Sequence, residues 1–195
     1  MKKLKNFKGF NWIGFFTLYL KEVKRFFNVF AQTIIAPGIT TLLFYIIFSL
    51  SIDRNYLNTE HYTFSEFLAP GLICMAIMQN SFANTSSSIL ISKVQGNIVD
   101  VLMAPLSDIE LAFGYIIGSV CRGIICGIVT SFGVLIFVPL EVYSLSALLF
   151  YALMGCVMMG SLGTIVGIWA DKWDQQQGIT NFIILPLTFL SGTFY

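Results

Sequence analysis

Long runs without a charged side chain are the feature that most restricts what this chain can fold into. Residues 26–52 and 67–92 each contain no Asp, Glu, Lys or Arg. An α-helix rises about 1.5 Å per residue, so about 20 apolar residues cross the hydrocarbon of a bilayer. Both runs exceed that length, and similar runs follow in the second half of the chain. The pattern therefore predicts an all-α polytopic membrane protein.

The composition agrees with a membrane protein and argues against other classes. Hydrophobic residues make up 56% of the 195 residues and charged residues only 11%, whereas a soluble domain has roughly 25% charged residues. The net charge of +1 gives no basic field, so no nucleic-acid partner is expected. The cysteines lie in apolar stretches without the spacing of a zinc site, so we expect packing residues and no metal site. They are Cys74, Cys121, Cys126 and Cys156.

Five membrane segments are expected within a single domain of residues 1–195. They are residues 27–52, 67–92, 108–138, 145–170 and 178–195. Pro37 should kink the first segment by removing one backbone hydrogen bond. The last segment is expected to be broken around Pro186 and incomplete, and the polar residues 171–177 before it are expected to form a loop. Glycines along the third and fourth segments predict close helix packing. They are Gly114, Gly118, Gly123, Gly127, Gly155, Gly160, Gly163 and Gly167.

Residues 12–26 predict an amphipathic interfacial helix before the first membrane segment. Apolar side chains recur at steps of three and four residues, at Trp12, Phe16, Tyr19, Val23, Phe26 and Phe30. Polar and basic residues take the other side, at Thr17, Lys21, Lys24, Arg25 and Asn28. Aromatic bulk opposite basic charge is typical of a helix on an anionic leaflet, which makes membrane lipid an expected partner. The alternative is a tilted extension of the first segment.

The main polar interruption, residues 93–107, separates the second and third membrane segments. Apolar residues at helical spacing predict a short helix over residues 93–103 that ends before Pro105. These apolar residues are Val94, Ile98, Val101 and Leu102. Ser107 and Glu110 have the spacing of a capping box, in which each side chain bonds the other residue's backbone N–H, so a new helix should begin there. The insert is either a surface connector without a partner or a docking helix on which a soluble partner acts.

Several polar side chains lie inside the predicted membrane segments. Asn80, Asn84, Ser87 and Ser88 share one face of the second segment, and Arg122 lies within the third. Polar groups inside a membrane face either the helix bundle or water. These residues can therefore form hydrogen bonds between helices or line a wet translocation path, and the two roles are compatible. For Arg122, structural pairing is favoured over contact with a substrate.

The distribution of Lys and Arg predicts the orientation. With the N-terminus inside, the inner side holds seven basic residues before residue 26 together with Lys93 and Lys172, and the outer side holds only Arg54. Because basic residues are retained on the cytoplasmic side, we expect a cytoplasmic N-terminus. The insert would then be cytoplasmic, and the loops 53–66 and 139–144 would be external.

Five stretches give the chain a family resemblance over essentially all 195 residues. In chain order they read AQTIIAPGI, FLAPGLICM, NSFAN, KVQGNIVDVLMAPLSDIELAFGYIIGSVCRG and ILPLTFLSGTFY. Together with the N-terminal amphipathic helix, they resemble an ABC-2 type export permease of the bacterial inner membrane. The resemblance implies six spans, a cytoplasmic coupling helix after the second span, and a broken fifth segment with external gate helices. It also implies an exporter of two permeases, here a homodimer, and two ABC ATPase subunits.

The resemblance assigns ATPase coupling to the insert. The residues implied are Val94, Gln95, Gly96, Asn97, Ile98, Asp100, Val101, Leu102 and Pro105. The chain has no G-x-x-x-x-G-K-[ST] motif, so ATP would be bound by the partner, and no cofactor and no catalytic residue are expected here. No Asp or Glu lies deep in a predicted span, which argues against a proton-coupled secondary transporter, the first alternative. A membrane enzyme would need a His, Cys or carboxylate cluster at one membrane face.

Relative to the six-span pattern, the gate region is incomplete and the sixth span is absent. We therefore expect a chain that ends at Tyr195 to be a truncated permease without ATP-driven export, which is the second alternative. The family exports polysaccharides, lipid-linked precursors and drugs, and the sequence does not select among these substrates.

Overall fold

The computed structural model describes residues 10–51, 64–139 and 142–190, and every regular element within them is a helix. This confirms the prediction of an all-α protein. The elements are α1 (Trp12–Asn28), the π-helical turn η1 (Ala31–Ile35), α2 (Ala36–Ser51), α3 (Phe64–Val94), α4 (Ile98–Leu102), α5 (Asp108–Leu135), α6 (Leu145–Trp169), α7 (Trp173–Ile179), the π-helical turn η2 (Thr180–Ile184) and α8 (Leu185–Leu190). The basic residues 2–8, most of the predicted external loop at 53–66, and residues 191–195 lie outside the described part of the chain.

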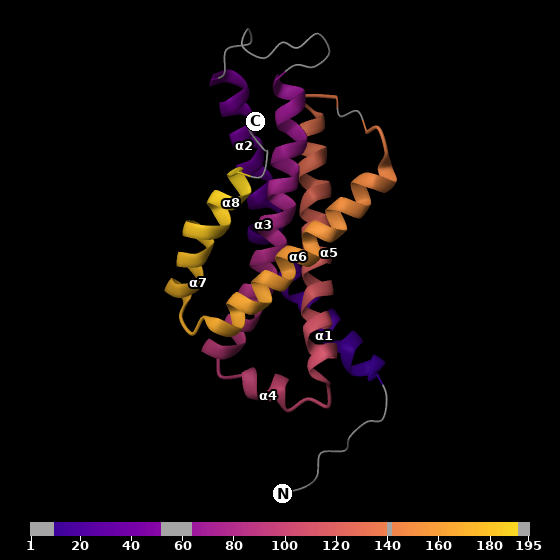
Figure 1. Cartoon of the computed structure of the whole chain (residues 1–195), viewed down its shortest axis with the longest axis vertical. Coiled ribbons are helices and arrows are strands. Elements are labelled where there is room, and N and C mark those ends of the chain that lie inside the picture. The colour runs from indigo at the N-terminus through magenta and orange to yellow at the C-terminus, as the bar shows by residue number, and fades with distance from the viewer. Residues whose placement is uncertain (1–9, 52–63, 140–141, 191–195) are drawn as a thin grey trace, which may run out of the picture.

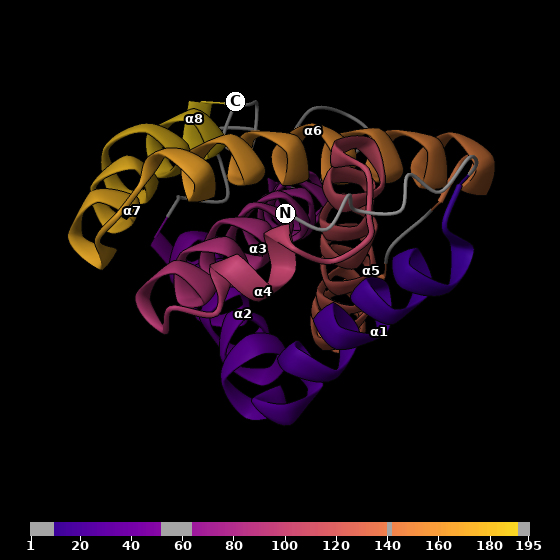
Figure 2. The same ribbon diagram turned by 90° about the horizontal axis from the view of Figure 1, so that it is seen from below.

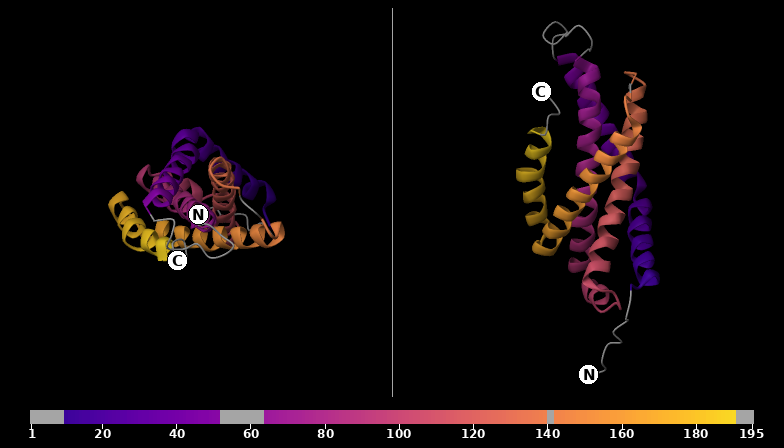
Figure 3. Two further views of the ribbon diagram at one scale, coloured as in Figure 1. Left: turned by 90° about the horizontal axis from the view of Figure 1, so that it is seen from above. Right: turned by 45° about the vertical axis from the view of Figure 1, so that its right-hand side comes forward.

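Two long helices, α3 and α5, form the centre of the fold. α6 crosses both on one side, while α1 and α2 pack on the other (Figure 1, Figure 2). α4 lies at one end of the bundle, between the last turn of α3 and the first turn of α5, and we call this the α4 end. The start of α3 and the end of α5 lie at the opposite end. The segment from α7 to α8 returns along α3 (Figure 3).

Glycines allow α5 and α6 to approach their neighbours closely, as the sequence predicts. A Cβ atom on Gly163 of α6 would lie 2.5 Å from a backbone oxygen of α3, and one on Gly123 of α5 would overlap Ser81 Oγ. On Gly114, near the α4 end, a Cβ atom would lie 2.5 Å from a leucine side chain of α1. Small residues thus let backbones pack against each other where larger side chains would separate them.

The interruption expected at Pro37 takes the form of η1, the π-helical turn just before it. Because Pro37 has no N–H, the carbonyl of Thr33 loses its usual donor four residues further on. Cys126 Sγ of α5 lies 3.3 Å from that oxygen and donates to it. α1 ends at Asn28 and the chain continues through η1 into α2, so the predicted segment 27–52 begins inside the last turn of α1.

The loop predicted at residues 171–177 is wrong, because α7 begins at Trp173. The prediction equated a polar run with a lack of regular structure. In the structure, Gln176 is buried, and its amide donates to Ser86 Oγ of α3 at 2.9 Å. The last helical segment therefore starts earlier than predicted, and the break expected at Pro186 is again a π-helical turn, η2, just before the proline.

Three helical stretches of the described chain are long and apolar enough to cross a membrane: Ala31–Leu50, Asp108–Leu135 and Leu145–Trp169. They correspond to the predicted first, third and fourth segments. The predicted second segment is α3, a helix of 31 residues whose C-terminal half carries many polar side chains. Most of those polar side chains are buried. Neighbouring helices therefore cover the polar half of α3.

α1 is a helix where the sequence predicts one, but its faces are divided differently. Glu22 and Phe26 are buried against the bundle, whereas Trp12 and Phe16 of the predicted apolar stripe are exposed. Arg25, one of the basic residues predicted opposite the apolar stripe, directs its guanidinium to α3 and donates to it. A charged group that finds hydrogen-bond acceptors on a neighbouring helix can face the interior.

Candidate functional site

The insert between α3 and α5 is not the single helix that the sequence predicts over residues 93–103. α3 continues to Val94, residues 95–97 form a turn, and α4 comprises only Ile98–Leu102. The turn forms at Gly96, whose φ of 76° is a left-handed conformation that favours glycine and ends helices. Apolar periodicity continues across this glycine, which is why the pattern did not reveal the break.

One face of α4 packs against the protein. Val101 contacts the buried cluster of Leu18, Ile89 and Tyr115, and Ile98 is partly buried. These cluster residues belong to α1, α3 and α5. The inner face of α4 therefore packs against a cluster that three helices build.

The other face of the insert is an exposed apolar surface. Val99, Leu102 and Met103 expose 55%, 66% and 66% of their surface, and we call these three residues the α4 patch. Val94, at the end of α3, is also exposed. The predicted single apolar face is wrong, because its members are split between the two sides, and the pattern missed Val99 and Met103. The remaining residues assigned to coupling are all exposed: Gln95, Gly96, Asn97, Asp100 and Pro105.

Hydrogen bonds hold the insert at both ends. The capping box is confirmed, since Ser107 N–H donates to Glu110 Oε2 at 2.7 Å and Glu110 N–H donates to Ser107 Oγ at 3.3 Å. Asn11 at the start of α1 donates its backbone N–H to Glu110 Oε1 and its side-chain Nδ2 to Pro105 O at 3.0 Å. At the other end, Lys93 Nζ donates to backbone oxygens at the end of α6, one of them at 2.9 Å. The insert is thus tied to α1, α5 and α6.

A buried ionic cluster joins α1 to the polar half of α3. Glu22 is fully buried; its Oε1 accepts from Ser88 Oγ at 2.7 Å and its Oε2 accepts from Arg25 Nε at 3.3 Å. Arg25 also donates to Asn84 O at 2.9 Å, Asn84 Oδ1 at 2.8 Å and Ser87 Oγ at 3.3 Å. The pattern within α1 alone did not connect the two charged residues with this polar face of α3. The spacing of three residues between Glu22 and Arg25, beside aromatic side chains, was the signal in the sequence for a buried ion pair.

Arg122 pairs with the remaining member of the predicted polar set. It is 8% exposed, and its Nη2 donates to Asn80 Oδ1 at 3.1 Å. Asn80 Nδ2 in turn donates to Ala76 O at 2.9 Å. Within residues 10–51, 64–139 and 142–190, Arg122 Nε has no hydrogen-bond partner. Of the predicted polar residues, Asn80 alone lines the pocket described next.

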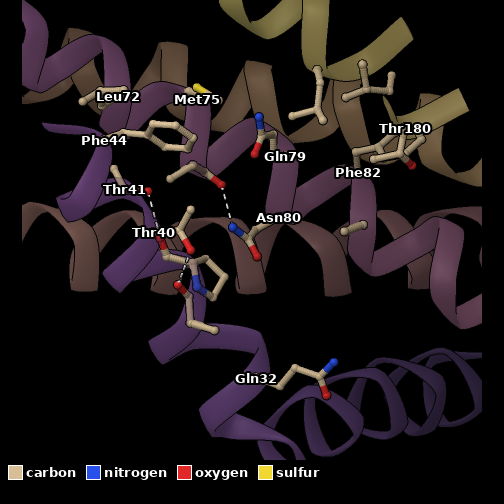
Figure 4. Close-up of a pocket in the computed structure, with 16 residues that line it drawn as sticks. Gln32, Thr40, Thr41, Phe44, Leu72, Met75, Gln79, Asn80, Phe82 and Thr180 are labelled. Atoms are coloured by element: carbon tan, nitrogen blue, oxygen red, sulfur yellow. Dashed lines mark hydrogen bonds between the residues drawn. The ribbon is translucent and has the colours of Figure 1, made fainter. Parts of the chain in front are cut away.

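A pocket of about 370 Å³ lies between α2, α3 and the segment from η2 to α8. Its walls come from η1 and α2, the middle of α3, and η2 with the start of α8. Figure 4 shows Phe44, Leu72 and Met75 gathered at one side of it, and Gln79 and Asn80 on the neighbouring turns of α3. The polar lining residues are Gln32, Thr40, Thr41, Gln79, Asn80 and Thr180. This pocket was not predicted from the sequence, although amides inside charge-free runs were a signal for it.

Comparison with known proteins identifies the family. The sequence model of the ABC-2 type transporter family matches residues 14–195. The chain therefore belongs to the ABC-2 type transporter family, which confirms the resemblance and makes the chain a membrane permease homologue.

Among individual proteins, the chain is 33% identical over 184 residues to the inner membrane transport permease YadH of Escherichia coli K12, and the match covers 94% of this chain and 72% of the relative. The same values apply to YadH of Escherichia coli O157:H7 and of Shigella flexneri. No solved structure matches the chain.

Proposed function

We propose that this chain is the membrane-spanning permease subunit of an ABC exporter in the bacterial inner membrane, and that a separate ATPase subunit binds ATP and supplies the energy. The observation that carries the proposal is the α4 patch, an exposed apolar surface on a short, firmly anchored helix at one end of the bundle. Contiguous exposed apolar side chains mark a contact surface rather than a solvated connector. Membership of the ABC-2 family and similarity to a transport permease support an ATPase as the partner.

The charge distribution supports a cytoplasmic α4 end and a cytoplasmic N-terminus. Lys93 lies in the last turn of α3, next to α4, and pairs with Asp171, which precedes Lys172. Lys21 and Lys24 lie on α1, whose N-cap Asn11 bonds Pro105 in the loop after α4. The described residues at the opposite end of the bundle include no Lys or Arg. By the positive-inside rule, the α4 end then faces the cytoplasm, where an ATPase is available. In this topology α1 lies against lipid at the inner interface, and the five predicted segments enter or cross the membrane.

The hydrogen bonds of the insert support a route from α4 to the pocket. A force on α4 reaches α1 through the bond from Asn11 Nδ2 to Pro105 O in the loop after α4, and it reaches α3 through the ionic cluster around Glu22. Arg122 on α5 then contacts Asn80, which lines the pocket. Movement of α4 would therefore shift α1 and α5 against α3 and reshape the pocket wall. We infer that the pocket is one half of a translocation path that a second copy of the permease completes.

The test is loss of the ATPase from variants of the α4 patch. Leu102→Asp and Val99→Asp each place a carboxylate on this exposed surface, where they leave the packing of α4 on the bundle unchanged. If the surface is buried by the ATPase, each change removes about 1.5–3 kcal/mol of apolar burial and adds the cost of burying a charge. We expect co-purification of a co-expressed ABC ATPase subunit to fall by at least about tenfold, with unchanged abundance in the membrane.

Gln177→Asp is the matched control, because it adds the same charge at an exposed position of α7, away from α4. This variant should retain the ATPase. Retention of the partner at wild-type levels by both α4 variants would mean that the insert is only a connector.

One observation favours a secondary transporter as a second candidate. The sequence offers no acidic residue deep in a span, yet the structure buries Glu22 completely between α1 and α3. A buried carboxylate can serve as a proton site in a carrier. Its bonds to Arg25 and Ser88 instead support a fixed structural ion pair. Glu22→Gln distinguishes the two: a proton-driven carrier would lose its dependence on the proton gradient, whereas an ATP-driven exporter has none to lose.

A further inference from the structure

The lining of the pocket restricts the charge of what it binds. None of the 16 lining residues has an ionisable side chain. The charged residue that touches the lining, Arg122, is buried and directs Nη2 to Asn80. Moving a charged group from water into such a site forfeits its hydration without offering a counter-ion. The pocket therefore disfavours both anions and cations.

The lining also carries hydrogen-bonding capacity that the described chain does not use. The side-chain amide of Gln32 has no hydrogen bond to any residue among 10–51, 64–139 and 142–190, although its backbone N–H donates to Val29 O at 3.0 Å. Gln79 donates to Thr188 Oγ1 at 3.1 Å, which engages one end of its amide. Thr40 and Thr41 each donate to the carbonyl four residues earlier, at 2.9 Å, which leaves their oxygens able to accept. In hydrocarbon such groups need a partner, so a purely apolar ligand would leave them unpaired.

The polar and apolar parts of the lining are arranged as two surfaces. Figure 4 shows Gln32 at one end of the pocket and Gln79 at the other, with Phe44, Leu72 and Met75 forming an apolar wall beside Gln79. The volume of about 370 Å³ lies in the range of small-molecule sites. A ligand that fills it meets amides and hydroxyls on one part of its surface and aliphatic and aromatic carbons on another.

We propose that the pocket binds uncharged amphipathic molecules, whose hydroxyl or amide groups bond Gln32, Thr40 and Gln79 and whose apolar part lies against Phe44 and its neighbours. The inference rests on the proposed function, and it names the class of molecule that the permease admits to its path. The neutral polar groups of such a molecule form hydrogen bonds with the free amides without burying a charge. A charged ligand would bury its charge, and a purely apolar ligand would leave the amides unpaired.

Three photoreactive probes test the charge preference. They share one diazirine-bearing alkyl chain and differ only in the head: a monoacylglycerol with two hydroxyls, a fatty acid with a carboxylate, and an alkylamine with an ammonium group. Each is titrated against the purified protein in lipid nanodiscs, and the labelled peptides are identified by mass spectrometry. We expect the monoacylglycerol to label peptides of α2, α3 and η2 that line the pocket, at a concentration at least about fivefold lower than either charged probe.

Two variants and a matched control test the residues. Gln32→Leu and Thr40→Val remove single hydrogen-bonding groups from exposed positions, so the fold should persist. Each should raise the concentration of monoacylglycerol for half-maximal labelling about two- to tenfold, as expected for one neutral hydrogen bond. Thr164→Val is the control, because Thr164 also donates to the carbonyl four residues earlier, at 2.8 Å, but lies outside the pocket lining. It should label like the wild type.

The proposal is overturned if the charged probes label the pocket as well as the neutral one, or if Thr40→Val and Thr164→Val behave alike. Neither result depends on the ATPase. If the α4 variants lose the ATPase while charged probes fill the pocket, the permease assignment stands and the ligand class is wrong. If the neutral preference holds while the α4 variants keep the ATPase, the binding site stands and the coupling proposal is wrong.

Discussion

Replacing Gly123 with alanine should destabilise the bundle, because α5 meets α3 and α6 at this position without room for a Cβ atom. The new methyl group would overlap Ser81 Oγ and would lie 2.9 Å from Cys156 Sγ and 3.2 Å from Ile77 O. The last two atoms belong to a buried side chain of α6 and to the backbone of α3, neither of which can move far. Ser81 Oγ can rotate, but it then loses its hydrogen bond to Ser119 O, now 3.3 Å long.

The size of the effect follows from three contributions. Overpacking of a tight interior costs about 1–3 kcal/mol. Loss of the bond from Ser81 to Ser119 costs about 1 kcal/mol more. Alanine has a higher helix propensity than glycine, which stabilises the folded state by about 1 kcal/mol and offsets part of these losses. The free energy of unfolding should therefore fall by about 1–3 kcal/mol for Gly123→Ala.

A double-mutant cycle tests the cause rather than only the size. Ser81→Ala alone should cost about 1 kcal/mol, because it removes one weak hydrogen bond. In that background the overlapping oxygen is gone, so Gly123→Ala should add at most about 1 kcal/mol, which gives a favourable coupling of about 1–2 kcal/mol. The measurement is unfolding by sodium dodecyl sulfate in mixed micelles, followed by circular dichroism.

Gly38→Ala is the matched control. Gly38 is also a buried helical glycine, but its nearest neighbour, Val129 Cγ1, would lie at an ordinary contact distance of 3.5 Å from the new methyl group. This variant should be neutral or slightly more stable. If Gly123→Ala is no more harmful than Gly38→Ala, or if its cost is the same with Ser81→Ala, then close packing through the glycine is refuted.

Two further predictions concern the ionic cluster and the topology. Glu22→Ala removes the acceptor of Ser88 and the ion-pair partner of Arg25, which keeps its other bonds, so the same unfolding assay should show a loss of about 2–3 kcal/mol. Glu22→Gln keeps an acceptor for Ser88 and should lose less, and equal losses for the two variants would rule out a contribution of the bond from Ser88. In a cysteine-free background, a cysteine at Tyr143 should react with an impermeant thiol reagent in intact cells, whereas one at Gln95 should react only after permeabilisation. The reverse pattern would invert the topology and exclude a cytoplasmic α4 patch.

The features that the sequence predicted correctly depend on residues close together in the chain. The capping box needs only Ser107 and Glu110, three residues apart, and the structure has both of its bonds. The long helices follow from uninterrupted apolar runs. The break in the insert was missed because Gly96 fits a helical pattern as well as a turn, and only its φ distinguishes the two. A feature can therefore be predicted from the sequence when residues close together in the chain allow only one local structure.

The features that the sequence missed depend on partners distant in the chain. The charge of Arg25 is typical of a solvated helix face. Arg25 instead points into the bundle because Asn84 of α3 accepts hydrogen bonds from its guanidinium. Gln176 belongs to a polar run that predicts a loop, and its burial depends on Ser86 of α3, which accepts a hydrogen bond from its amide. The pocket joins residues around Gln32, Gln79 and Thr180, from three separate segments. No periodicity within one segment contains that information.

The two π-helical turns make the number of residues in a membrane segment as consequential as their hydrophobicity. A π-helical turn bonds each residue to the one five positions away, so it holds one residue more than the same stretch of α-helix. Deleting a single residue from Ala31–Ile35 would therefore restore α-helical bonding and leave α2 at nearly the same angle about the helix axis. Deleting two residues would rotate everything beyond by about 100°, because no extra residue remains to absorb the second loss. Thr40, Thr41 and Phe44 would then leave the pocket wall, although the segment would be as apolar as before. The same holds for Thr180–Ile184. The rotation of α2 and α8 about their own axes therefore depends on the number of residues that precede them, and the amino-acid composition does not contain this number.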